Sequence, residues 1–432
     1  MDRLVQYALG LALVVMQLVN LRVGLNGRPA VVSLFLLGFG AVSVLTLPWL
    51  LRPGLRTRSG NLVLGSFLVL LGWALWSSLN TPLPRVLKPW VDVSRPYLVV
   101  PVVTAIATTA SAWGLMAAVS PARRPVLLWR ASMLLAATTL LAGPRTMLAN
   151  HSLRLGTGMG GAAIYHVVLL LAGAVLLRSA LRDEHRRWSL AGVAVCLLGI
   201  LMTGSRAGLL SLLVFLGLLG VAFAMRGRIK LVLALSGALV ALLVALMAVF
   251  PVARRLVQPN EQFRAANYET AWRTWQASGH NTWLGVGSGR MWPWYFYESG
   301  ASPVPWRGVI QTGYGRSLTN PHSLYLGVLA ELGLVGAALL LVLVGAVVWQ
   351  LVVAWRTMLR TAPGAPAAEA LASLATLVVP LALFATLVAF AVDHYLFKNF
   401  AISFWWWLVL AATWGLRGPV RQDQSASVEV SA

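Results

Sequence analysis

Residues Leu324–Trp355 read LYLGVLAELGLVGAALLLVLVGAVVWQLVVAW, a run of 32 residues with one charged side chain, Glu331. About 20 consecutive apolar residues are enough for an α-helix to cross the hydrocarbon core of a bilayer. The whole chain has the same character, because hydrophobic residues make up 59% of its 432 residues, charged residues make up 11%, and the mean hydropathy is +0.77. The sequence therefore predicts an all-α polytopic membrane protein.

Eleven further apolar runs of about spanning length surround this stretch. They cover residues 4–23, 30–51, 61–79, 96–119, 126–142, 161–178, 188–204, 207–225, 231–250, 370–392 and 399–416. About twelve spans place both termini on the same side of the membrane. The first run lacks a small-residue cleavage site and is followed at once by a second run, so we expect a retained helix rather than a signal peptide.

One long polar segment, rich in Trp and Arg, interrupts the spans. The chain accordingly divides into helices 1–9 (1–250), a long outer loop with an amphipathic helix (251–321), helices 10–12 (322–416) and a tail that we expect to be disordered (417–432). A long non-spanning segment in such a protein is where recognition or chemistry is expected.

The arginines and lysines orient the chain through the positive-inside rule. With a cytoplasmic N-terminus, the inner connections, the tail and Arg3 supply 17 positive residues, against nine in the short outer connections. The long segment then faces outward. The formal net charge is +22, and the outer side still holds 16 positive residues against five negative ones. This excess indicates an anionic partner, and outside the cell a lipid-linked phosphate or diphosphate is more natural than nucleic acid.

The turn Thr203-Gly204-Ser205-Arg206-Ala207-Gly208 places an arginine between two apolar runs. In one interpretation Arg206 snorkels to the interface and ends a helical hairpin, at a cost of about 2–3 kcal/mol at most. In the other, the glycines let backbone amides and the guanidinium approach one anion together. Position alone leaves both interpretations open.

The long segment begins with aromatic residues at near three-to-four spacing, which predicts an amphipathic helix carrying Arg264 and Arg273. Such a helix can lie on the membrane or hold its arginines at the level of lipid phosphates. The following turn, Leu284–Arg290, is rich in glycine, but without a preceding strand it is a weak phosphate signal and a simple loop is the better interpretation.

Asn320-Pro321-His322 closes the segment, and Asn before Pro predicts that His322 lies in the first turn of a helix at the outer surface. An isolated histidine is usually an ordinary polar residue. Next to a basic loop, however, its near-neutral pKa suits a general base that acts on a hydroxyl. The outer carboxylates are scattered and form no DxD or acidic cluster, so we expect no metal and no cofactor, and arginines would neutralise a departing diphosphate.

The turn TGSRAG (203–208), the long outer loop and NPHSLYLGVLAELGLVG (320–336), within twelve spans, resemble the O-antigen ligase family of Gram-negative envelopes. That family belongs to a wider superfamily of O-antigen ligases and polymerases. The resemblance implies a GT-C-like, metal-independent, inverting glycosyltransferase. It would move O-polysaccharide from undecaprenyl diphosphate to lipid A–core, in lipopolysaccharide biosynthesis, at the periplasmic face of the inner membrane. We expect it to work as a monomer.

The resemblance also assigns residues. Arg206 matches the arginine of the small-residue turn, and His322 matches the essential histidine of the family's Asn-x-His motif. The essential arginine of the family's long loop corresponds to Arg264, Arg273 or Arg290, and none of the three fits the family pattern cleanly. Asp393 corresponds to a family aspartate.

Ser323 stands where many family members have Asn after the histidine, so we expect no catalytic role for it. Two related alternatives use the same lipid-linked glycan donor, namely an O-antigen polymerase and an O-linked protein glycosyltransferase. Polymerases usually have two substantial outer loops, and this chain has one. A transporter or flippase would be expected to have paired charges or broken helices inside the spans, where we find only Arg130 and Glu331.

Overall fold

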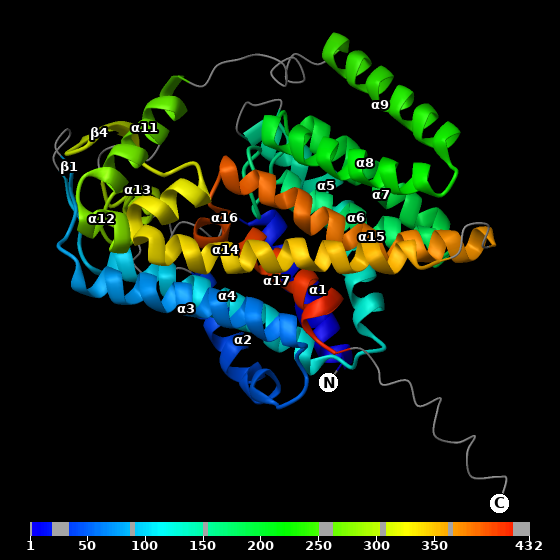
Figure 1. Cartoon of the computed structure of the whole chain (residues 1–432), viewed down its shortest axis with the longest axis horizontal. Coiled ribbons are helices and arrows are strands. Elements are labelled where there is room, and N and C mark those ends of the chain that lie inside the picture. The colour runs from blue at the N-terminus through cyan, green and yellow to red at the C-terminus, as the bar shows by residue number, and fades with distance from the viewer. Residues whose placement is uncertain are drawn as a thin grey trace, which may run out of the picture.

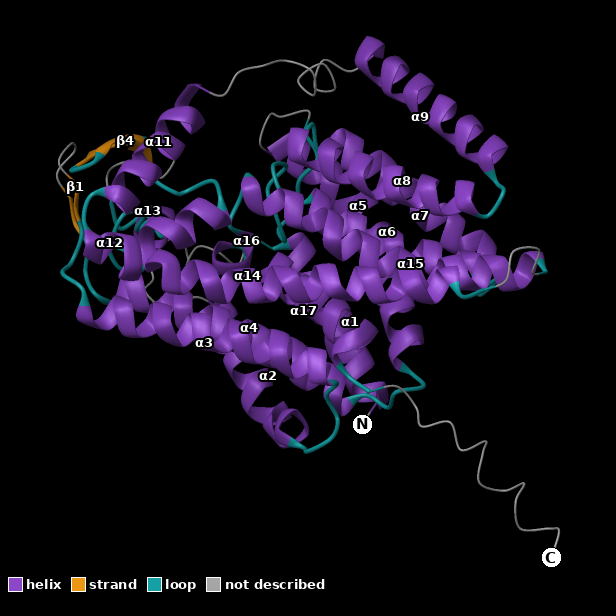
Figure 2. Cartoon of the chain, viewed as in Figure 1, coloured by secondary structure: helices purple, strands orange, loops and turns teal. Residues whose placement is uncertain are grey.

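The computed structural model describes residues 2–19, 34–86, 91–149, 154–249, 262–302, 308–361 and 366–417. In these ranges the chain forms a bundle of long helices, with short helices and a hairpin gathered at one end (Figures 1 and 2). The start of the long loop (250–261) and the tail from residue 418 onward, which we expect to be disordered, lie outside the described residues.

Within the described residues, every predicted apolar run overlaps a helix. These helices are α1 (Asp2–Leu18), α2 (Leu34–Leu51), α3 (Arg58–Asn80), α4 (Pro96–Ala118), α5 (Arg124–Ala149), α6 (His166–Leu181), α7 (Arg186–Met202), α8 (Arg206–Met225), α9 (Ile229–Val249), α14 (Leu324–Leu359), α15 (Ala367–Thr386) and α17 (Phe400–Leu410). Eight of the helices in the described ranges are long and apolar enough to cross a membrane. The prediction of an all-α polytopic membrane protein is confirmed.

The connections between these helices contain short elements. They are β1 (Arg85–Val86), β2 (Val91–Asp92), α11 (Gln262–Gln276), α12 (Gly279–Leu284), α13 (Trp294–Glu298), β3 (Val309–Thr312), β4 (Gly315–Leu318), the 3-10 helix η2 (Leu387–Ala391), α16 (Tyr395–Lys398) and a π-helical turn after α17 (Ala411–Gly415). β1 pairs with β2, and β3 pairs with β4, each pair antiparallel. The long outer segment is thus partly helical and also contains the β3–β4 hairpin.

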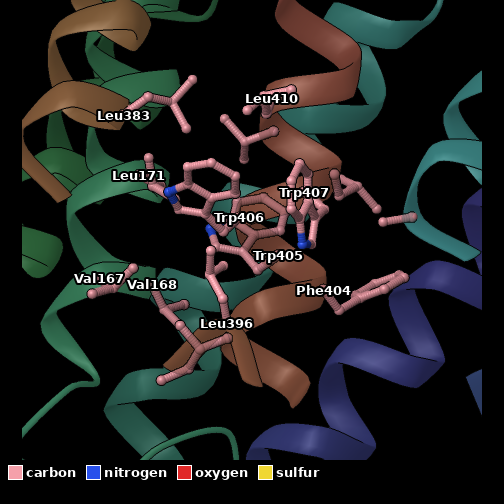
Figure 3. Close-up of a cluster of buried hydrophobic side chains, with 14 of the residues drawn as sticks. Val167, Val168, Leu171, Leu383, Leu396, Phe404, Trp405, Trp406, Trp407 and Leu410 are labelled. Atoms are coloured by element: carbon pink, nitrogen blue, oxygen red, sulfur yellow. The ribbon is translucent and has the colours of Figure 1, made fainter. Parts of the chain in front are cut away.

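Helix α17 lies at the centre of the bundle, where it packs against α4 and α6. All 11 of its residues are buried, including three consecutive tryptophans, Trp405, Trp406 and Trp407 (Figure 3). A helix that is apolar on every face can be buried in lipid or in protein, and here protein surrounds it. The indole Nε1 of Trp406 donates a hydrogen bond of 2.9 Å to the Oγ1 of Thr386, which fixes α17 against the end of α15.

Helix α14 has 36 residues and is kinked near its outer end at Gly333, where φ is +65° and ψ is −163°. A Cβ atom at Gly333 would lie 2.3 Å from the carbonyl oxygen of Trp283, so glycine is required both for the backbone conformation and for the close contact. The kink lets α12 and the glycine-rich turn after it pack against α14. The long outer segment is therefore anchored on the helix that follows the Asn320–His322 turn.

Candidate functional site

Helix α11 brings the long outer segment against the start of α14 (Figure 1). Its buried face is formed by small and polar residues at three- and four-residue spacing: Asn267, Thr270, Ala271 and Thr274. This spacing places them on one helical face, and α11 packs against α14 and β4. The predicted aromatic stripe is a separate feature, since Trp272 is 46% exposed and its ring centroid lies 4.7 Å from that of Trp275.

Asn267 ties α11 to the turn that contains His322. This fully buried side chain donates a hydrogen bond of 2.6 Å from Nδ2 to the carbonyl oxygen of Pro321. Its Oδ1 accepts a hydrogen bond of 3.2 Å from the indole Nε1 of Trp292. A buried amide with partners on both ends fixes the relative position of the segments that it joins.

Tyr268, the next residue of α11, holds the same turn. Its hydroxyl lies 3.2 Å from the carbonyl oxygen of His322 and 3.2 Å from the carbonyl oxygen of Ala391. A phenol carries one hydrogen to donate, so the two carbonyls share it. Tyr268 therefore joins α11 to the backbone of His322 and to the end of η2.

The turn between α7 and α8 is built by its small residues. Gly204 adopts a left-handed conformation, with φ of +57°. Ser205 is the N-cap of α8, where its Oγ accepts a hydrogen bond of 3.2 Å from the N–H of Gly208 and donates one of 2.7 Å to the carbonyl oxygen of Ala163. A Cβ atom at Gly208 would lie 2.8 Å from the His166 ring, so glycine permits the close packing of α8 on α6. Arg206 is consequently the first residue of α8.

Arg206 and Arg264 line one cavity of about 410 Å³, together with Arg154. The remaining lining residues are Ala163, Gly204, Ser205, Ala207, Ala265, Tyr268 and Val392. The cavity thus combines three guanidinium groups with the N-terminus of a 20-residue helix, whose backbone dipole also favours anions. None of the described residues that line it is acidic.

Arg154 is a residue that the sequence did not single out as part of a site. Its Nε donates a hydrogen bond of 2.9 Å to the carbonyl oxygen of Thr203, which holds it beside the turn that carries Arg206. In the sequence it is one of several arginines in short outer connections, and no local motif distinguishes it. Only the proximity of two distant loops in the fold reveals its position.

The structure places the other two candidate loop arginines away from this cavity. Arg273 is nine residues after Arg264 on α11, which is about 180° around a helix of 3.6 residues per turn, and it pairs with Glu269 at the surface. Arg290 donates a hydrogen bond of 3.3 Å from its guanidinium to the carbonyl oxygen of Val286, within its own glycine-rich turn. Of the three loop arginines, Arg264 alone lines the cavity with Arg206.

The glycine-rich turn binds a carboxylate of the same chain. The backbone N–H groups of Gly289, Met291 and Trp292 donate hydrogen bonds of 2.9, 3.0 and 2.9 Å to the carboxylate of Glu331. Gly285 permits the close approach, since a Cβ atom there would lie 2.3 Å from the backbone of Glu331. The turn therefore resembles an anion-binding loop whose anion is an in-span glutamate of α14, and its role is to dock the long segment.

We expect a Glu331→Gln variant to be destabilised by about 2–4 kcal/mol, because charge-assisted hydrogen bonds to buried backbone amides are each worth about 1.5–3 kcal/mol. Thermal unfolding of the purified protein in detergent measures the effect. Glu369→Gln, at an exposed position in the first turn of α15, is the matched control and should unfold like the wild type. Equal unfolding temperatures for the two variants would show that Glu331 does not anchor the turn.

His322 does not lie in the first turn of α14, and that expectation was wrong. The helix begins at Leu324, because Ser323 is its N-cap and accepts a hydrogen bond of 3.3 Å from the N–H of Leu326. His322 precedes the cap and adopts a left-handed conformation, with φ of +48°. Its backbone N–H donates a hydrogen bond of 3.1 Å to the Oδ1 of Asn320. Such a conformation costs a non-glycine residue about 1–3 kcal/mol, and the hydrogen bonds from Asn267 and Tyr268 hold the turn in place.

We expect a Tyr268→Phe variant to lose about tenfold in turnover while it keeps its fold, because one hydrogen bond of about 1–1.5 kcal/mol to the backbone of His322 disappears. The resemblance implies glycan transfer, and its rate with purified protein at saturating substrates measures this effect. Tyr314→Phe, in the turn of the β3–β4 hairpin, removes a hydroxyl far along the outer segment and should leave turnover within twofold. Turnover equal to that of the wild type in Tyr268→Phe would exclude a positioning role for this hydroxyl.

Asp393 and His394 follow η2 and are buried, with exposed fractions of 6% and 5%. Burial lowers the pKa of His394 well below its usual value, and electrostatic interaction with Lys398 and His322 lowers it further. The backbone N–H of Asp393 donates a hydrogen bond of 2.9 Å to the carbonyl oxygen of Ala389, and this bond closes the turn after η2. The structure thus brings Asp393 and its neighbour to the same end of the bundle as His322.

Metal-ligating side chains do not gather in groups of three or more His, Cys, Asp or Glu anywhere in the described ranges. The positive charge that the described residues bring to the cavity comes from arginine side chains and from the start of α8.

Comparisons with known proteins bear on this arrangement. A search of curated proteins gave no match. The family model described as O-antigen ligase matches residues 191–341, which extend from α7 across the cavity arginines Arg206 and Arg264 to the first half of α14. The resemblance noted in the sequence is thereby confirmed over residues 191–341, which are similar to the O-antigen ligase family.

Proposed function

We propose that this protein is an O-antigen ligase that transfers O-polysaccharide from undecaprenyl diphosphate to lipid A–core at the periplasmic face of the inner membrane. The observation that carries the proposal is the cavity where Arg154, Arg206 and Arg264 meet the N-terminus of α8, next to the turn that contains His322. The family match supports a lipid-linked glycan donor and a lipid acceptor in general.

The cavity has the charge that a lipid diphosphate requires. Guanidinium groups bind phosphate oxygens in bidentate fashion, and three of them contact a space of about 410 Å³. A diphosphate accumulates negative charge as it leaves the sugar, so fixed positive groups stabilise the transition state more than the bound substrate. Arginines in these positions would perform the role that a divalent cation has in metal-dependent glycosyltransferases.

His322 would act as the general base. In the proposed step a hydroxyl oxygen of the acceptor sugar attacks the anomeric carbon, and its proton passes to the His322 imidazole. The bond from the anomeric carbon to the diphosphate oxygen breaks, and the electron pair leaves with the diphosphate. In-line displacement on one face of the sugar inverts the anomeric configuration. Asp393, buried at the same end of the bundle, would orient the imidazole.

The proposed orientation follows from the distribution of charges. The 17 positive residues of the inner connections, the tail and the N-terminal Arg3 favour a cytoplasmic location for both termini. The α7–α8 turn and the start of α14 then face the periplasm together with the long segment. A lipid diphosphate anchored in the outer leaflet of the inner membrane would reach the cavity from the side.

The test is glycan transfer by purified protein in lipid nanodiscs, with undecaprenyl-diphosphate O-polysaccharide and rough lipopolysaccharide as substrates, in the presence and absence of EDTA. The expected product is lipopolysaccharide capped with O-antigen, formed at the same rate with EDTA. Elongation of the lipid-linked glycan instead would identify a polymerase, and transfer to a protein would identify a protein glycosyltransferase. Absence of any transfer would contradict the proposal.

A further inference from the structure

A second cavity borders the turn that contains His322, through Pro321. Its lining includes Tyr97, Trp294, Tyr295, Pro321 and His394, and its volume is about 60 Å³. A water molecule needs about 10–15 Å³ measured in this way, so the cavity has room for about four to six waters. This is the size of one hydroxyl-bearing edge of a sugar ring, with the rest of the sugar outside.

Two short stretches of chain border both this cavity and the arginine cavity. In the first, Pro321 lines the small cavity, whereas the carbonyl of His322 is bound by Tyr268, which lines the arginine cavity. In the second, Val392 lines the arginine cavity and His394 lines the small one. Residues next to His322 and Asp393 therefore border the two cavities.

His394 is one of the polar residues that line the small cavity, together with Ser288 and Glu331. The side chain is 5% exposed, and neither Nδ1 nor Nε2 has a hydrogen-bond partner among the described residues. A buried polar group normally has a partner. Burial, followed by electrostatic interaction with Lys398 and His322, lowers the pKa of His394 well below its usual value and so favours the neutral imidazole. A neutral imidazole has one nitrogen that donates and one that accepts. That combination matches a hydroxyl, which also donates and accepts.

The walls of the small cavity suit a carbohydrate rather than a phosphate. The Trp294 ring lies edge-on to the ring of His394, with centroids 6.2 Å apart, and Tyr97 and Tyr295 add further aromatic surface. Aromatic rings pack against the C–H groups of sugars. None of the described residues that line this cavity is an arginine or a lysine. The carboxylate of Glu331 also borders it, but three backbone amides already bind that group.

A buried ion pair fixes the frame of the cavity. The Nζ of Lys398 lies 3.6 Å from the Oε1 of Glu298, and both side chains are less than a tenth exposed. The pair joins α13, which carries Trp294 and Tyr295, to α16, which follows His394. The aromatic wall and the imidazole are therefore held at a fixed separation.

From these observations we infer that the small cavity is the subsite for the acceptor sugar, and that His394 binds a hydroxyl of that sugar. The inference rests on the proposed function. It places the acceptor and the glycan donor in separate cavities that both border the turn containing His322, the residue proposed to take the proton as the two sugars are joined.

The experiment compares His394→Phe, which keeps an aromatic ring, and His394→Asn, which keeps hydrogen-bonding groups, with the wild type. We expect His394→Phe to raise the KM for rough lipopolysaccharide at least tenfold and to leave the KM for the lipid-linked glycan within twofold. His394→Asn should recover part of the loss. The control is His280→Gln, at an exposed position on α12, which should match the wild type. An unchanged acceptor KM, or equal changes for both substrates, would overturn the inference.

A binding measurement separates this inference from the proposed function. Core oligosaccharide released from rough lipopolysaccharide is titrated into protein in nanodiscs, which needs no turnover. Weaker binding to His394→Phe than to wild type, together with an unchanged unfolding temperature, supports the subsite even if no transfer is detected. Equal binding by wild type and variant, in protein that does transfer glycan, would reject the subsite and leave the proposed function intact.

Discussion

A His322→Ala variant is expected to transfer glycan at least about a hundredfold more slowly than the wild type, since a positioned general base contributes about 10²–10⁴-fold to rate. The variant should still insert into the membrane, because His322 precedes the N-cap of α14 and lies outside the spanning helices. Cells that rely on it should therefore produce lipid A–core without O-antigen. Transfer by purified protein gives the rate, and lipopolysaccharide profiles give the cellular result.

The comparison for this variant is His185→Ala, in the short α6–α7 connection on the proposed cytoplasmic side. It removes an imidazole that no part of the proposed chemistry uses, and it should support normal capping. Capped lipopolysaccharide in normal amounts from His322→Ala would remove histidine from the mechanism. A poorly inserted His322→Ala protein would be recognised by its low abundance in membranes, and the purified rate would then decide.

The second large effect concerns two arginines on one helix. Arg264→Ala should lower turnover by about 10²–10³-fold, as expected when one group that stabilises developing charge is removed. Arg273→Ala should remain within about twofold of the wild type, because Arg273 lies on the opposite face of α11 in an exposed pair with Glu269. The measurement is the rate of glycan transfer at saturating acceptor, with thermal unfolding to show that both variants are folded.

Arg264→Lys extends this test. Lysine keeps the charge but loses the planar, bidentate geometry of a guanidinium, so we expect a rate between those of Arg264→Ala and the wild type. A large loss in Arg273→Ala together with a small loss in Arg264→Ala would place the diphosphate on the other face of α11. The proposed cavity would then be the wrong one.

The fold was largely predictable from composition and run length. Each apolar run forms a helix, since a spanning segment must satisfy its own backbone hydrogen bonds. The apolar runs do not reveal which helices are surrounded by lipid and which are surrounded by protein. The run containing Trp405–Trp407 is as apolar as a lipid-facing span, yet α17 is buried on all sides by other helices. The kink at Gly333 likewise depends on a contact with Trp283, about 50 residues earlier.

The site was predictable in part. The turn around Arg206 and the Asn-Pro-His sequence stand out locally, and the structure brings them to the same end of the bundle. Helical periodicity alone shows that Arg264 and Arg273 lie on opposite faces, but the face that meets Arg206 depends on how Asn267 and its neighbours pack against α14. Arg154 and His394 carry no sequence signal, since their significance arises only from contacts between distant loops.

One error at the local level has a clear physical cause. Asn before Pro is a signal for a helix start, but in this chain Ser323 provides the cap and the helix begins at Leu324. The side chain of Asn320 instead accepts a hydrogen bond from the backbone N–H of His322. This hydrogen bond forms a short-range turn that competes with helix formation. The left-handed conformation of His322 follows from this turn and is not visible in residue preferences.

In the proposed mechanism, guanidinium groups at the start of α8 and on α11 bind the phosphates of the lipid-linked donor beside His322. The most direct measurement is an electron cryomicroscopy structure of the protein in lipid nanodiscs with undecaprenyl diphosphate bound. We predict both phosphates in the cavity lined by Arg154, Arg206 and Arg264, with guanidinium nitrogens about 2.7–3.2 Å from phosphate oxygens. Phosphates bound away from Arg206, or held by a metal ion in place of the arginines, would contradict the account.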